Sequence, residues 1–183
     1  MTVRISKPAF NLRDKLTELD FARVPYEKMP PQSIIQRKRF FVTSFKQSSS
    51  SSDLDLIVGQ IRPIFSSSQI LIELAVTPYA GNEGTLSARG RIRRGYGVGT
   101  GSTGTQIYYN RRMYYRTNTP APKAFCGQMV AMDEPHTTDI LEYVFQTSVE
   151  SSSNSSTIEF YADGYSAGAP ENTMTLMEIR GNS

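Results

Sequence analysis

The chain of 183 residues carries a formal net charge of +3, with 38% hydrophobic and 20% charged residues. This length and apolar content suit one folded, soluble domain with an extension. A charge of +3 is too small to indicate a nucleic-acid partner. Ten Tyr and nine Phe without any Trp favour a β architecture over a helical bundle. The single cysteine, Cys126, excludes a disulfide within the chain.

The N-terminal region contains the most convincing amphipathic helix that the sequence predicts. Leu12, Leu16 and Leu19 recur at i, i+4 and i+7 and therefore share one face, and Asn11 is a plausible N-cap. The prolines in VPYEKMPP then end the helix and favour extended backbone. So short a helix is marginal alone in water. It therefore needs a surface, either on its own β domain or on another chain.

The start of the chain, MTVRISKPAF, lacks the apolar core of a signal peptide. No run of apolar residues in the sequence approaches the roughly 18 needed to span a membrane. We therefore expect a protein made in a cytoplasm, without membrane insertion. Its organisation is predicted as an N-terminal anchor over residues 1–32, with a short helix and a Pro-rich extended segment, followed by a β domain over residues 33–183.

The β domain begins with strand-like segments separated by polar loops. Residues 33–45 are rich in β-branched and aromatic side chains and are predicted to form a strand or a bent pair of strands. A serine-rich loop leads to a second strand within residues 54–65. The clearest strand is QILIELAV, which places four apolar side chains on one face and Glu73 on the other. The four apolar residues are Ile70, Ile72, Leu74 and Val76.

A hairpin is predicted in the middle of the chain. LSARGRIRRG alternates strictly, with arginines 89, 91 and 93 on the face opposite Leu86 and Ile92. QIYYNRRMYYRT is its expected partner, and the long glycine-rich loop YGVGTGSTGT between them is expected to be mobile or shaped by a partner. Four more strand-like segments follow, and the regular spacing predicts an all-β protein with a two-sheet β-sandwich or jelly roll of about eight to ten strands.

Three segments, ISKPAFNLRDKLTELDFARVPYEKMP, IRPIFSSSQILIELAV and TMTLMEI, resemble small virion proteins encoded by marine tailed phages, particularly phages of cyanobacteria. Those proteins are described as tail-fibre or structural proteins. The resemblance implies a homotrimeric, fibre-knob-like jelly-roll head carried on a virion. The stretch from about residue 81 to 135 is less similar. With the anchor as the virion-docking element, the residues expected to bury on the particle are Phe10, Leu12, Leu16, Leu19 and Phe21.

The strongest surface signal is the alternation of tyrosine and arginine in IYYNRRMYYR. Tyrosine stacks on flat ligand faces and arginine offers planar hydrogen-bond donors. One of the two rows should be buried, and Tyr108, Arg112, Tyr114 and Arg116 are taken as the surface for a partner. That partner is another virion protein or a host-surface glycan. The alternative is that the strand only packs in the core and forms a solvated rim.

No arrangement of residues indicates catalysis, a cofactor or a metal. GTGSTG matches G-x-G-x-x-G, but a strand-like segment follows it where the dinucleotide motif needs a helix. One cysteine and one histidine, His136, cannot form a zinc site in a single chain without several carboxylates. Carboxylate pairs such as Asp53 with Asp55 and Asp139 with Glu142 leave a polysaccharide-acting enzyme as a minor alternative.

The sequence therefore predicts a phage virion structural protein that acts by binding. It is expected to be a homotrimeric tail-fibre or spike-like component that docks by its N-terminus and projects a β head. The alternative is a capsid decoration, head-fibre or tail scaffold protein without a host ligand.

Overall fold

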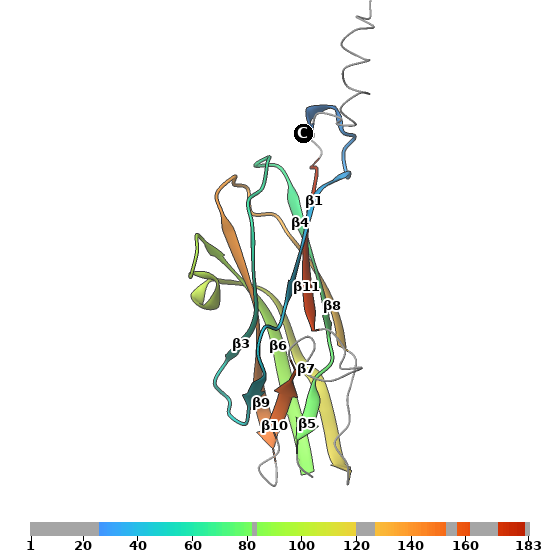
Figure 1. Cartoon of the computed structure of the whole chain (residues 1–183), viewed down its shortest axis with the longest axis vertical. Coiled ribbons are helices and arrows are strands. Elements are labelled where there is room, and N and C mark those ends of the chain that lie inside the picture. Colours follow the sequence, from blue (N-terminus) through green and yellow to red (C-terminus); the bar gives the residue numbers. More distant parts are fainter. Residues whose placement is uncertain (1–25, 82–83, 120–126, 153–156, 162–171, 182–183) are drawn as a thin grey trace, which may run out of the picture.

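The computed structural model describes residues 26–81, 84–119, 127–152, 157–161 and 172–181. The predicted N-terminal helix, its five docking residues and Cys126 lie outside these ranges. The described elements are η1 (Tyr26–Lys28), β1 (Ile34–Phe41), β2 (Lys46–Ser48), β3 (Leu54–Ile61), β4 (Gln69–Val76), β5 (Tyr79–Gly81), β6 (Gly84–Tyr96), η2 (Gly101–Thr103), β7 (Thr105–Thr119), β8 (Gly127–Asp133), β9 (Leu141–Ser152), β10 (Thr157–Phe160) and β11 (Thr173–Ile179). Strands dominate these ranges and run along the long axis of the molecule (Figure 1), which confirms the all-β prediction.

The strands form a sandwich with the order of a jelly roll. Sheet A has the order β1-β11-β4-β8, and sheet C, the other layer, has the order β3-β9-β6-β7. A small sheet B has the order β2-β10-β5. Its strands adjoin β1, β11 and β4 along the chain, in the same order as in sheet A, so sheet B continues sheet A. The chain therefore pairs as if folded in half: β6 with β7, β4 with β8, β3 with β9, and β1 with β11, all antiparallel. This nested pairing is that of a jelly roll.

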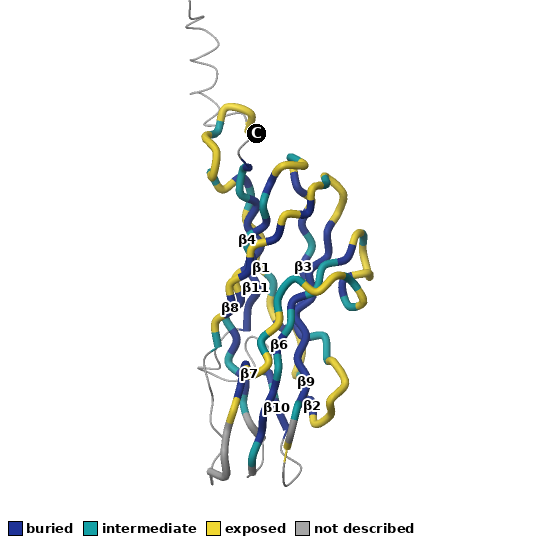
Figure 2. Tube along the Cα trace, turned by 180° about the vertical axis from the view of Figure 1, so that it is seen from behind, coloured by how far each residue is buried: buried dark blue, intermediate teal, exposed yellow. Residues whose placement is uncertain are grey.

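The core lies between the two layers and is built from the alternating strands that the sequence predicts. Ile70 and Ile72 of β4 are fully buried, and Leu86 and Ile92 of β6 face them from the other layer. Glu73, between the apolar positions of β4, is exposed as predicted. Every side chain from Leu141 to Val149 in the central strand β9 is buried, and the strand is dark blue in Figure 2. Burial on both faces of β9 requires that its outer polar side chains find partners.

One asparagine joins sheets A and B. Asn172 is 2% exposed. Its Nδ2 donates to the carbonyl of Tyr161 (2.9 Å), its Oδ1 accepts from the backbone N–H of Thr77 (2.7 Å), and its carbonyl accepts from the N–H of Val42 (3.1 Å). These bonds satisfy backbone groups at the three places where the chain passes between the sheets. They keep the extended layer continuous.

The first described residues are held against the end of β11. The Arg180 guanidinium donates to the carbonyls of Tyr26 (3.1 Å), Glu27 (2.9 Å) and Met29. Gln32 and Ser33 also exchange backbone hydrogen bonds with Arg180 (2.8 and 2.9 Å). Residues 26–33 are therefore fixed at the end of β11.

The glycine-rich loop between β6 and β7 is shaped by the domain itself. The Glu142 carboxylate accepts from the backbone N–H groups of Gly99 (2.9 Å) and Gly101 (3.0 Å), and also from Gln60 Nε2 (2.8 Å). Gly99 has φ +79°, a left-handed conformation that favours glycine. An internal carboxylate therefore holds the loop that was expected to be mobile or shaped by a partner. The hairpin prediction itself is confirmed.

Candidate interaction surface

The outer face of sheet C carries a ladder of charged and polar side chains. Arg89, Arg91 and Arg93 alternate along β6 and so point away from the core, as the sequence predicts. The neighbouring strand β9 contributes Gln146 and Ser148 to the same face. This side of the molecule is therefore polar, with arginine as its main basic group.

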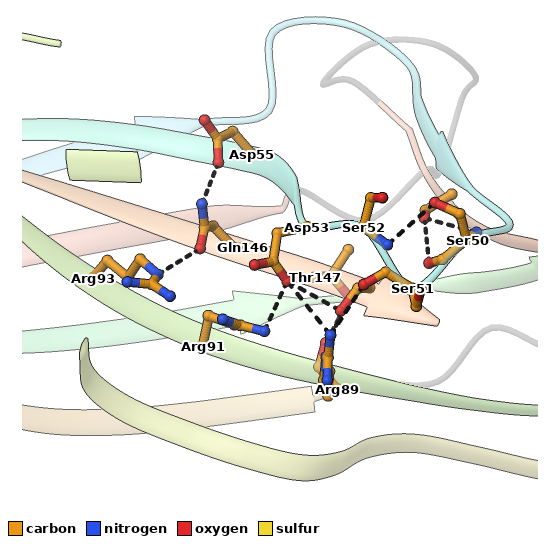
Figure 3. A network of polar contacts seen from close by, with 12 residues as sticks. Ser50, Ser51, Ser52, Asp53, Asp55, Arg89, Arg91, Arg93, Gln146 and Thr147 are labelled. Atoms are coloured by element: carbon orange, nitrogen blue, oxygen red, sulfur yellow. Dashed lines mark hydrogen bonds and ion pairs between the residues drawn. The ribbon is translucent and has the colours of Figure 1, made fainter. Parts of the chain in front are cut away.

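One part of the ladder is centred on Asp53 (Figure 3). Arg91 Nη2 lies 2.8 Å from Asp53 Oδ1, and Arg89 Nη2 lies 3.9 Å from the same oxygen. Arg89 Nε donates to Ser148 Oγ (2.6 Å), and its Nη2 donates to the carbonyl of Ser51 (3.0 Å). These contacts tie the serine-rich loop before β3 to the middle of sheet C.

The second part of the ladder connects to the glycine-rich loop. Arg93 donates to Gln146 Oε1 (3.0 Å) and to the carbonyl of Gly104 (2.8 Å). Gln146 Nε2 donates to Asp55 Oδ1 (2.7 Å), and the Ser102 hydroxyl also donates to Asp55. The pair Asp53 and Asp55 thus serves a structural network.

Beside the ladder, the edge strand β7 presents four exposed side chains that we name the Tyr/Arg cluster: Tyr109, Arg111, Arg112 and Tyr115. Tyr109 is 41% and Tyr115 is 57% exposed. The guanidinium of Arg112 lies over the Tyr115 ring, 5.6 Å from its centroid, and that of Arg91 lies 5.9 Å from the Tyr109 centroid. Such cation–π contacts hold planar groups in place at a surface.

Arg111 is paired across the sheet with Glu150. Its Nε lies 2.6 Å from Glu150 Oε1. The hydrogen bond from Arg111 lowers the pKa of Glu150, and the same bond raises the pKa of Arg111. Both groups therefore stay charged around neutral pH. The cluster can offer a fixed arginine–carboxylate pair between two exposed aromatic rings.

Of the residues predicted for the partner surface, Tyr114 is 3% exposed and belongs to the core. Tyr108 is only partly buried, against that core. Of the other predicted residues, Arg112 is exposed, and the side chain of Arg116 lies outside the described structure. Tyr114 therefore cannot contact a partner while the domain is folded.

A bulge explains why alternation fails in β7. Asn110 pairs with Gly90 and Tyr114 pairs with Ala88, so three residues of β7 lie opposite the single residue Arg89. Asn110 Oδ1 accepts from the backbone N–H of Arg112 (3.0 Å) within this bulge. As a result Met113 and Tyr114 are both buried although they are adjacent. Tyr109 and Tyr115, which strict alternation also predicts to share one face of the strand, are exposed.

A second polar group is buried between the layers. Arg94 Nη1 donates to both carboxylate oxygens of Asp133 (2.7 and 2.8 Å), and the Tyr143 hydroxyl donates to Asp133 Oδ2 (2.6 Å). Burial and the neighbouring carboxylate raise the pKa of Tyr143, so the phenol stays protonated. This group joins β8 to β6 and β9 and is enclosed, with Asp133 8% exposed. Its role is structural.

The remaining candidates from the sequence are His136 and a metal site. His136 is an exposed loop residue with φ +52°, and it borders a hollow of about 290 Å³ with Gln69 and Glu134. Gln69 Nε2 donates to Glu134 (2.6 Å). Within the described ranges no three His, Cys, Asp or Glu side chains are grouped to hold a metal. No helix there is long and apolar enough to cross a membrane.

Comparisons with known proteins give structural likeness only. No protein-family model matches the chain, and no curated protein matches it. Similar solved structures include infectious bursal disease virus VP2 subviral particle (14% identity, TM-score 0.39, 87% of this chain and 42% of that chain). T=1 particles derived from the same virus (13%, 0.40, 87% and 41%) and its Gt strain (12%, 0.36, 87% and 43%) are also similar. The chain spans about two fifths of those chains. Such low identities and TM-scores establish no shared function.

Proposed function

We propose that this protein is a structural component of a virus particle that works by binding and carries out no chemistry. In its specific form it is a homotrimeric tail-fibre or spike-like component of a phage. Residues 1–32 dock it to the particle, and the β domain projects outward. The observation that carries this proposal is the jelly-roll strand order. It is the head that the sequence resemblance implies, and viral capsid and lectin domains use the same architecture.

The state of the carboxylates supports binding over catalysis. Asp53, Asp133 and Glu142 are each occupied by arginines or by hydrogen-bond donors. A glycosidase needs two carboxyls facing each other across a substrate cleft, one as acid and one as base or nucleophile. The carboxylates named here are linked instead to side chains and backbone of their own domain. They stabilise the sandwich and its loops.

The Tyr/Arg cluster is the surface that we propose for recognition. Two exposed tyrosine rings can stack on the apolar faces of sugars at a small entropic cost, and Arg112 can donate to hydroxyl or anionic groups. A host-surface glycan fits this chemistry. The second candidate is a capsid decoration, head-fibre or tail scaffold protein, whose cluster would meet a neighbouring virion protein. The Arg–Tyr contacts are equally compatible with a protein partner, because protein interfaces are rich in both residue types.

Incorporation into particles tests the docking half of the proposal. A virus carrying Leu16→Asp should produce particles that lack this chain, while Leu16→Met, which keeps an apolar side chain of similar size, should be incorporated normally. The full chain should remain folded in both variants, as judged by circular dichroism. Normal incorporation of the Asp variant would contradict docking through this segment.

Depletion from solution tests the recognition half. Purified chain is mixed with host cells or with their isolated surface polysaccharide, and the unbound fraction is measured. Removal by polysaccharide, without release of new reducing ends, supports a host-binding head. Binding to empty particles but to no host fraction would favour the decoration or scaffold role, and release of sugar ends would overturn binding without chemistry.

A further inference from the structure

The outer face of sheet A carries a group of apolar side chains, whereas the outer face of sheet C carries the polar ladder. Met177, Leu71 and Met132 lie directly opposite one another across β11, β4 and β8, so they form one apolar row. The adjacent row contains Glu73 and Val130 on the same face. We name Leu71, Val130, Met132 and Met177 the apolar strip.

The apolar strip is open to solvent where it reaches the edge of the sheet. Val130 is 58% and Met132 is 48% exposed, and both belong to the edge strand β8. An edge strand with exposed apolar side chains invites pairing with another chain unless something covers it. Towards β11 the strip is covered by the domain itself, because Met177 is 6% exposed. The opposite layer, by contrast, fills its outer face with arginines bound to carboxylates and amides.

Charged residues beside the strip indicate what covers it. Arg37 and Arg39 lie on β1 at one edge of sheet A, and Glu73 lies on β4, two strands away. Together they line a shallow hollow of about 350 Å³ with Thr173, Thr175 and Val130. The same face therefore offers a basic edge, an acidic centre and an apolar strip. That combination is complementary to a second copy of itself.

The geometry of such a contact follows from the strand order. If the β8 side of one copy lies against the β1 side of the next, the exposed Val130 and Met132 are covered and Glu73 approaches Arg37 or Arg39 of the neighbour. This contact joins two different parts of the face, so successive copies can close into a ring such as a trimer. Placing like charges opposite each other would be unfavourable, which fixes the direction of approach.

We propose that the outer face of sheet A, with the apolar strip at its centre, is the surface through which copies of this chain associate. This inference deepens the proposed function and rests on it for its setting on a particle. Association through sheet A leaves the Tyr/Arg cluster on sheet C free for another partner. The assembled protein then has one layer for self-association and one for recognition.

The first test compares two valines at matched positions. Val130 of β8 and Val58 of β3 are both on edge strands and are 58% and 47% exposed, but they belong to opposite layers. Native mass and sedimentation of the full chain are measured over a range of concentrations. The wild type and Val58→Lys should form multiples of 20.4 kDa, and Val130→Lys should weaken association by at least about tenfold. A monomeric wild type, or an equal effect of both substitutions, would overturn the inference.

The second test reverses the charges. Glu73→Arg alone and Arg39→Glu alone should each weaken association, and mixing the two variants, or combining them in one chain, should restore it. No recovery in either experiment would refute the pairing between Glu73 and the β1 arginines. These measurements need no virus. A chain that associates through this face but is absent from particles would overturn the proposed function and leave this inference intact.

Discussion

The Glu142 carboxylate is the most informative single place at which to perturb this fold. Glu142 is 4% exposed, and Gly99, Gly101 and Gln60 all donate to it at 2.8 to 3.0 Å. Glu142→Ala removes the acceptor and leaves these three donors without their partner. A hydrogen bond to a charged group contributes about 1.5–3 kcal/mol. Because the three share one carboxylate and the loop can relax towards water, we expect a total loss of about 3 kcal/mol.

Urea and thermal unfolding of the full chain measure this loss. For a chain of this size, about 3 kcal/mol corresponds to a fall in Tm of roughly 6–12 °C. Protein concentration must be held constant, since self-association couples Tm to concentration. Glu134→Ala is the control, because Glu134 is exposed and accepts one bond, from Gln69. Its expected effect is within about 0.5 kcal/mol. Similar losses in both variants would refute the role assigned to Glu142.

The same carboxylate makes a directional prediction about pH. Burial alone raises the pKa of Glu142, but the hydrogen bonds from Gly99, Gly101 and Gln60 outweigh it, and the folded-state pKa is lowered. A lowered folded pKa means that the contribution is fully present above the unfolded value and is lost as pH falls through the folded pKa. The stability difference between wild type and Glu142→Gln should therefore be constant near neutral pH and shrink in acid. A difference that grows in acid would contradict this sign.

Three further predictions concern other parts of the molecule. Gly59→Ala should destabilise the domain by roughly 1–3 kcal/mol in urea unfolding, because a Cβ there would lie 2.6 Å from the Phe40 ring; an unchanged midpoint would show that the ring moves aside freely. Asp133→Ala leaves the buried Arg94 charge unpaired and should cost about 3–5 kcal/mol, and a loss under 1 kcal/mol would mean that Arg94 reaches solvent. Tyr115→Ala should weaken depletion by host polysaccharide without changing Tm, whereas equal depletion of variant and wild type would remove Tyr115 from the recognition surface.

Much of the sandwich could be predicted because its central strands alternate without interruption. The apolar faces of β4 and β6 are visible in QILIELAV and LSARGRIRRG, and the structure buries the predicted side chains. The β6–β7 hairpin followed from the same pattern. The alternation of apolar and polar residues is a local property, so it can be recognised in the sequence wherever a strand has no bulge.

Which side chains reach the surface, and what they contact, was harder to predict, because both depend on strand register and on residues distant in sequence. The bulge opposite Arg89 buries both Met113 and Tyr114. No local feature of the sequence IYYNRRMYYR indicates this bulge. Glu142 meets Gly99 and Gly101 only because β9 lies beside β6 in the sheet. The apolar strip likewise joins strands that are distant in sequence. The predicted docking helix remains a prediction, because it lies outside the described residues.

Counting the chain in purified particles tests most directly whether it is a virion component. Particles are purified through successive density gradients, and the chain is quantified by mass spectrometry against other particle proteins. A homotrimeric virion component should keep a constant ratio through every step and a copy number divisible by three. A ratio that falls towards zero as purification proceeds, with the chain recovered in the soluble fraction of infected cells, would show that the chain is not part of the particle.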